Sequence, residues 1–83
     1  SSFPDLVALR DGSILLVECK VDGQMPSKER RKIVRLAREH VRGRAILAFK
    51  KGQDLLLREL SKRSARFDRD FDPRPDQDKE RKL

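Results

Sequence analysis

The feature that most constrains the fold is the dipeptide Asp11-Gly12, which interrupts an otherwise apolar stretch near the start of the chain. Asp-Gly between two hydrophobic runs is a strong signal for a two-residue β-hairpin turn. A hairpin with this loop fixes the register of its strands and sets Asp5 opposite Glu18. The sequence therefore predicts an antiparallel pair whose open end carries two carboxylates side by side. The predicted strands are residues 5–10 and 13–20.

These two carboxylates would repel each other. Side chains that face each other across two strands have Cβ atoms about 5 Å apart. Two negative charges at that distance repel by about 3 kcal/mol at an effective dielectric constant of about 20. A divalent cation, a shared proton or Lys20, two residues beyond Glu18 on the same face, could relieve the repulsion. We favour the cation, because Mg²⁺ prefers carboxylate oxygens as ligands.

The rest of the core follows from apolar patterning. Both faces of the predicted hairpin are apolar, which is typical of a strand pair inside an α/β layer. Residues 27–42 predict a helix with an apolar and a basic face, with Ser27 as N-cap and Gly43 as the left-handed residue that ends it. Residues 45–49 predict a further strand. Residues 55–60 are ambiguous: the segment is short and follows a turn, which favours a strand, but its composition would also suit a helix. The predicted fold class is thus α/β, a mixed β-sheet with one flanking helix, and its second face would need an upstream helix or a second subunit to cover it.

The composition changes near residue 62. From there the chain alternates acidic and basic residues, with two prolines and few apolar groups, so it cannot bury enough surface to offset the entropy of ordering. The sequence therefore predicts a folded core over residues 1–61 and a mobile, charged tail over residues 62–83. The tail holds eight basic and six acidic residues, so most of the net charge of +7 belongs to the core.

A strongly basic chain with 42% charged residues commonly binds a polyanion, and nucleic acid is the expected partner. The alternative is a charged, solvated surface with no ligand. The absence of an apolar membrane span or signal peptide, together with a single cysteine, predicts an intracellular protein, cytoplasmic and associated with the nucleoid. The candidate phosphate contacts are basic side chains of the helix and of the end of the third strand: Lys28, Arg31, Arg35, Lys50 and Lys51.

Three other features of the sequence could suggest a catalytic or metal-binding role, but we expect none of them to have one. Cys19 points away from the two carboxylates by strand alternation, and we expect it to pack in the core. His40 lies on the apolar arc of the helix near its end, and we expect it to be partly buried. The Asp68-x-Asp70-x-Asp72 pattern resembles the opening of a calcium loop, but Pro73 stands where that loop requires glycine, so the sequence does not predict a calcium site.

The order of these motifs is also that of a known family. Pro4-Asp5, followed thirteen residues later by Glu18-Cys19-Lys20 at the end of an apolar strand, resembles the core motif of the PD-(D/E)xK nuclease superfamily. The basic helix and the strand that ends at Lys50 follow in the order seen in archaeal Holliday junction resolvases. The resemblance covers residues 1–61.

This resemblance implies a restriction-endonuclease-like core of the resolvase type and a Mg²⁺-dependent endodeoxyribonuclease, with Mn²⁺ as a possible substitute. It implies that Asp5, Glu18 and the backbone carbonyl of Cys19 bind the metal, and that Lys20 and Ser1 are catalytic. It further implies branched double-stranded DNA as substrate, a homodimer, no small-molecule cofactor, and an N-terminal acidic helix that would precede Ser1. Two alternatives stay open: another superfamily nuclease acting on linear DNA in repair or restriction, and a non-catalytic DNA-binding remnant.

Overall fold

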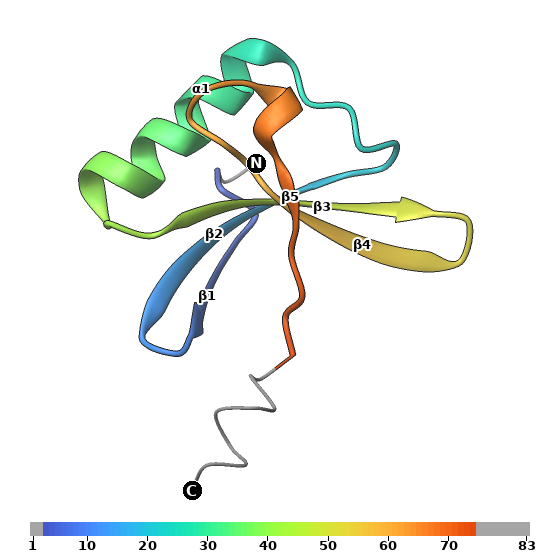
Figure 1. Ribbon diagram of the computed structural model, residues 1–83, viewed down its shortest axis with the longest axis horizontal. Coiled ribbons are helices and arrows are strands. Elements are labelled where there is room, and N and C mark those ends of the chain that lie inside the picture. Colours follow the sequence, from blue (N-terminus) through green and yellow to red (C-terminus); the bar gives the residue numbers. More distant parts are fainter. Residues whose placement is uncertain (1–2, 75–83) are drawn as a thin grey trace, which may run out of the picture.

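The computed structural model describes residues 3–74 and shows a five-stranded mixed sheet with one helix over one face (Figure 1). The strands lie in the order β1-β2-β3-β4-β5. The predicted fold class, α/β with a mixed sheet and a flanking helix, is confirmed. In chain order the elements are β1 (Leu6–Arg10), β2 (Ser13–Lys20), α1 (Ser27–Arg35), the π-helical turn η1 (Leu36–His40), β3 (Arg44–Lys51), β4 (Asp54–Glu59), the 3-10 turn η2 (Ala65–Phe67) and β5 (Arg69–Asp70).

The hairpin forms with the predicted register. β1 and β2 are antiparallel, and Arg10 pairs with Ser13 while Val7 pairs with Leu16. Asp11 and Gly12 both have positive φ, 50° and 79°, which is the conformation of the primed turns that match strand twist. The local sequence therefore determines this part of the sheet, and with it the relative positions of residues 5 and 18.

Helix α1 crosses between the parallel strands β2 and β3 and buries its apolar face against them. Ile33 and Ala37 are fully buried in the core on this face, together with Leu16 and Leu47. The alternation of β2 therefore turns Leu16, and beyond it Glu18 and Lys20, toward the helix side of the sheet.

The ends of the helix differ from the prediction. Ser27 is the first helical residue rather than a side-chain cap, and no side chain caps the helix. At the other end the left-handed residue is Arg42, with φ of 53°, and not Gly43. Gly43 is required for a different reason: a Cβ atom there would lie 2.2 Å from the carbonyl oxygen of Ile14. Strand β2 passes so close to the helix end that only glycine fits.

The ambiguous apolar segment after residue 53 is a strand, as predicted, and β4 pairs with β3 in antiparallel orientation. It extends the sheet to the side away from the hairpin. The second face of the sheet buries Leu15, Val17, Ile46 and Ala48.

Phe71 packs against this second face, and its N–H donates to the carbonyl oxygen of Leu57 at 2.9 Å. The Arg10 guanidinium lies 5.1 Å from the centre of the Phe71 ring. Residues 62–74, which the sequence assigned to a mobile tail, thus contribute a strand and a core aromatic. The predicted boundary at residue 61 does not coincide with the end of the packed structure, because η2 and β5 dock through contacts that composition does not reveal. The remainder of that predicted tail, residues 75–83, lies outside the described residues.

Candidate functional site

Asp5 and Glu18 meet where the first strand begins and the second ends. The Asp5 N–H donates to Glu18 Oε1 at 3.0 Å, and the Cys19 N–H donates to Asp5 Oδ2 at 2.9 Å. Each carboxylate is thereby anchored by a backbone amide of the other strand, which fixes the orientation of both groups. The hairpin register predicted this meeting of the two side chains, and their roles in metal binding and catalysis stay a prediction.

The Glu18 carboxylate is buried, with only 7% of the residue exposed, whereas Asp5 is exposed. Burial raises the pKa of Glu18 above its ordinary value, and the neighbouring Asp5 carboxyl raises it further. The Asp5 backbone amide and the more distant charge of Lys20 oppose this rise in the pKa. Ionising Glu18 in this site is therefore less favourable than in water, and a bound cation would favour the ionised form.

Lys20 does not form an ion pair with either of these carboxylates. Its Nζ lies 2.6 Å from Glu29 Oε2, in the first turn of α1. The hydrogen bond to Glu29 raises the pKa of Lys20, so its ammonium is charged at neutral pH. Glu29 carries no sequence signal that would mark it as a member of the site, because only the crossing of α1 over the end of β2 brings it there.

The exposed position of Cys19 contradicts the expectation that it packs in the core. Strand alternation places its side chain on the face of Leu15 and Val17, but near the end of β2 this position is exposed. His40 is exposed as well, and not partly buried as predicted. The π-helical turn shifts it off the apolar arc, since a wider turn advances each residue by less than the 100° assumed for an α-helix.

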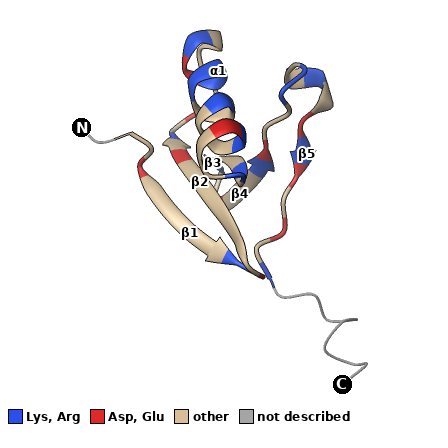
Figure 2. Cartoon of the chain, turned by 90° about the vertical axis from the view of Figure 1, so that its left-hand side faces the viewer, with Lys and Arg blue, Asp and Glu red and all other residues tan. Residues whose placement is uncertain are grey.

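The predicted phosphate contacts fall into two groups, all of them exposed. Lys28, Arg31 and Arg35 line one groove on the outer side of α1, and Figure 2 shows the basic residues along this helix. Lys50 and Lys51 end β3 just beyond Phe49, the residue that pairs with Lys20. Because β2 and β3 are parallel, both lysines lie at the same sheet edge as Lys20. Ser1 lies outside the described residues.

Within residues 3–74 no cluster of three or more Asp, Glu, His or Cys side chains could hold a metal ion. A cation here would have two carboxylates and would complete its shell with backbone oxygen and water, which suits Mg²⁺. No helix in the described part of the chain is long and apolar enough to cross a bilayer.

The sequence matches the family model described as archaeal Holliday junction resolvase (hjc) over residues 1–70. The chain belongs to this family. The resolvase match confirms the resemblance drawn from the motifs and extends beyond residue 61 to include η2 and β5. No curated protein and no solved structure matches the chain.

Membership in the resolvase family indicates a nuclease of DNA recombination and repair that acts on branched DNA junctions. The two carboxylates and Lys20 belong to the matched segment, as do the basic residues of α1 and β3.

Proposed function

We propose that this chain is a structure-selective endonuclease that hydrolyses phosphodiester bonds at four-way DNA junctions with the help of a divalent metal ion. The observation that carries the proposal is the anchored pair of carboxylates, Asp5 and Glu18, beside a charged lysine in a chain of the resolvase family. Such a nuclease acts where the chromosome is, which supports an intracellular location associated with the nucleoid.

The donor set suits magnesium. Asp5 and Glu18 each use one carboxylate oxygen to accept a backbone amide, and each has a second oxygen available as a ligand. The Cys19 N–H is directed at Asp5, and a strand residue presents its N–H and its C=O to the same neighbour. The Cys19 carbonyl oxygen therefore lies on the side of β2 that faces Asp5, and we propose it as the third protein ligand of the metal ion. A bound Mg²⁺ or Mn²⁺ would supply an activated water and offset negative charge on the phosphate.

Lys20 would stabilise the charge that develops on the phosphate oxygens and help to orient the attacking water. Glu29 holds its ammonium group in place and keeps it protonated. We regard Glu29 as a positioning residue, because its contact is with Lys20 and not with the reacting atoms. Ser1 is retained as a candidate catalytic residue on the family resemblance alone.

Recognition of the substrate would depend on shape. Lys28, Arg31, Arg35, Lys50 and Lys51 can contact phosphates but do not distinguish bases when they do so. A homodimer would present two such sites related by a two-fold axis, which suits the paired cuts that resolve a four-way junction.

The test is cleavage of labelled four-way junctions in Mg²⁺ by isosteric variants of the longest available gene product. Loss of a residue that only hydrogen-bonds to a metal ligand lowers metal affinity or activity by about 10–100-fold. Asp5 and Glu18 are proposed as direct ligands, so Asp5→Asn and Glu18→Gln should each reduce cleavage by about 100-fold or more. Asp11→Asn is the matched control: it removes one negative charge at the hairpin turn, where Asn-Gly is equally favourable. Wild-type cleavage in either carboxylate variant would refute the site assignment.

Two outcomes would favour the alternative functions. Equal cleavage of a four-way junction and of a linear duplex with the same sequence would indicate a repair or restriction nuclease of the same superfamily. Tight junction binding with no cleavage in Mg²⁺ or Mn²⁺ would indicate a non-catalytic DNA-binding protein.

A further inference from the structure

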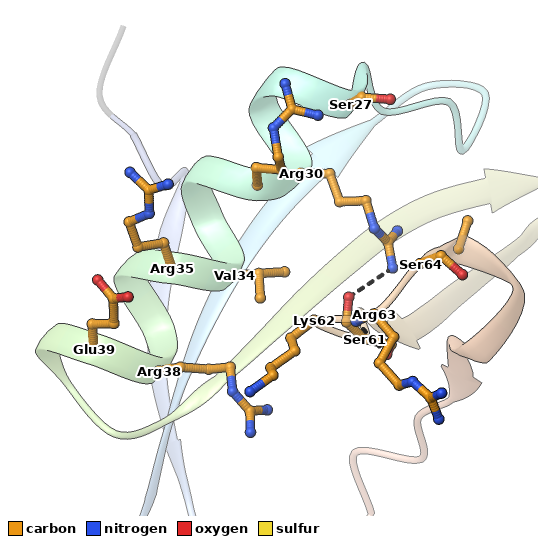
Figure 3. A pocket seen from close by; sticks show the side chains of 12 residues that line it. Ser27, Arg30, Val34, Arg35, Arg38, Glu39, Ser61, Lys62, Arg63 and Ser64 are labelled. Atoms are coloured by element: carbon orange, nitrogen blue, oxygen red, sulfur yellow. Dashed lines mark hydrogen bonds between the residues drawn. The ribbon is translucent and has the colours of Figure 1, made fainter.

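A second groove runs between α1 and the segment that follows β4, and it shares Arg31 and Arg35 with the first groove. It has a volume of about 700 Å³. Figure 3 shows its two walls, with Arg35 and Arg38 on the helical side and Lys62 and Arg63 on the opposite side. Buried Val34 and exposed Ala65 also line it. None of the residues assigned to metal binding or cleavage takes part.

The walls are held together by a buried ion pair. Arg30 Nη1 donates to Asp68 Oδ2 at 2.8 Å, and the side chain of Asp68 is only 4% exposed. Asp68 Oδ1 accepts the N–H of Ser61 at 2.8 Å, while Arg30 Nη2 donates to the Ser61 carbonyl oxygen at 3.0 Å. Residues 61–68 are thereby fastened to α1, so the groove is a preformed feature.

The charge of the groove is strongly positive. Asp68 compensates the charge of Arg30, but five other basic side chains line the groove and are exposed. Glu39 is the one carboxylate in the lining, and no carboxylate within residues 3–74 forms an ion pair with any of the five. These side chains are Arg31, Arg35, Arg38, Lys62 and Arg63.

The position of the groove separates it from the candidate metal site. Asp5 and Glu18 lie at β1 and β2, whereas Lys62 and Arg63 follow β4, with α1 between them (Figures 1 and 2). Strands are spaced about 4.8 Å apart, so the two to three spacings from β1 and β2 to β4 separate the two sites by about 10–14 Å in the direction across the strands. One base pair occupies about 3.4 Å of duplex, so this distance corresponds to about three to four base pairs.

We infer that this groove binds the sugar–phosphate backbone of a DNA arm several base pairs away from the phosphate that is cut. Its cations are spread along two walls, which fits a row of phosphates better than a single anion, and guanidinium groups match phosphate oxygens in geometry. Hydroxyl groups of Ser61 and Ser64 in the lining add uncharged donors of the kind that contact DNA backbone. The inference rests on the proposed function for the identity of the ligand, DNA.

The test measures binding of a labelled four-way junction in EDTA, so that cleavage plays no part. Arg38→Gln/Lys62→Gln removes one cation from each wall, and Arg42→Gln/Arg66→Gln is the control, because it removes the same charge from exposed positions outside the groove. Each lost phosphate contact reduces the slope of log affinity against log salt by about 0.9. The groove variant should therefore have a slope about 1.8 smaller than wild type. Between 50 and 200 mM salt, wild type should lose about 12-fold more affinity than this variant.

Equal slopes for the groove variant and the control would overturn the inference. A melting temperature measured for each variant verifies folding, and amide chemical-shift changes in the wild-type protein at residues 35–39 and 61–65 on adding DNA provide a second measurement. If those amides do not shift, the inference is also wrong. A protein that passes both tests but never cuts DNA would refute the proposed function and leave the groove assignment intact.

Discussion

The ion pair between Arg30 and Asp68 gives the sharpest test of how this fold is held together. Replacing Asp68 by alanine would leave the Arg30 guanidinium, whose side chain is 15% exposed, without its counter-charge and the Ser61 N–H without its acceptor. Removing one partner of a buried pair costs about 3–5 kcal/mol. Arg30 keeps its hydrogen bond to the Ser61 carbonyl oxygen, so we expect about 3 kcal/mol, at the lower end of that range.

This loss is large for a chain of 83 residues. Folded proteins have about 0.05–0.15 kcal/mol of stability per residue, which gives this chain about 4–12 kcal/mol in total. A loss of 3 kcal/mol should lower the melting temperature by about 12–24 °C. The assay is urea and thermal unfolding followed by circular dichroism.

The control is Asp70→Ala, which removes an exposed carboxylate two residues away, and surface changes of this kind shift stability by about 0.5 kcal/mol or less. The double variant Arg30→Met/Asp68→Ala should be more stable than Asp68→Ala alone, because it no longer buries an uncompensated cation. If Asp68→Ala destabilises the protein no more than Asp70→Ala does, the buried pair does not fasten residues 61–68 to α1.

Two further predictions concern the candidate metal site. The pKa of Glu18 is higher in the folded state than in the unfolded chain. Between these two pKa values the folded protein binds more protons than the unfolded chain, so without metal its stability should fall as pH rises through that window. Glu18→Gln should remove this slope and melt at a higher temperature than wild type at pH 7 in EDTA; an unchanged pH profile would contradict the account. Glu29→Gln should lower turnover by about 10-fold without weakening DNA binding, because Lys20 is no longer held in position. It should also shift the alkaline limb of the pH–rate profile to lower pH, because Lys20 loses the partner that raises its pKa. Unaltered turnover and pH profile would exclude Glu29 as a positioning residue.

The local sequence determined the part of this protein that matters most for the candidate chemistry. Asp11-Gly12 sets a two-residue turn, the turn sets the register, and the register brings Asp5 to Glu18. Each step depends on residues within fifteen positions of one another, so none required knowledge of the rest of the chain. The helix was predictable for the same reason, since the period of its apolar residues is a local property, and the third and fourth strands were predicted from short apolar runs next to turn residues.

Contacts between distant segments were decided only by the tertiary structure. Glu29 reaches Lys20, and Asp68 reaches Arg30, because elements far apart in sequence pack together. Neither pair has a local signature: a charged residue in a charge-rich chain looks the same whether it meets solvent or a buried partner. The second groove could not be predicted from sequence, because its two walls come from α1 and from a segment whose composition suggests no fixed structure.

Burial at the ends of elements also depended on packing. Cys19 and His40 sit at positions where an ideal strand or helix would turn them toward apolar surroundings, yet both are exposed: Cys19 lies near the end of β2, and the π-helical turn shifts His40 off the apolar arc. Gly43 was assigned to a helix end by its residue type, but it is the approach of the Ile14 carbonyl that excludes a side chain there. Periodicity determines which side a residue faces, and only the folded chain determines whether anything lies on that side.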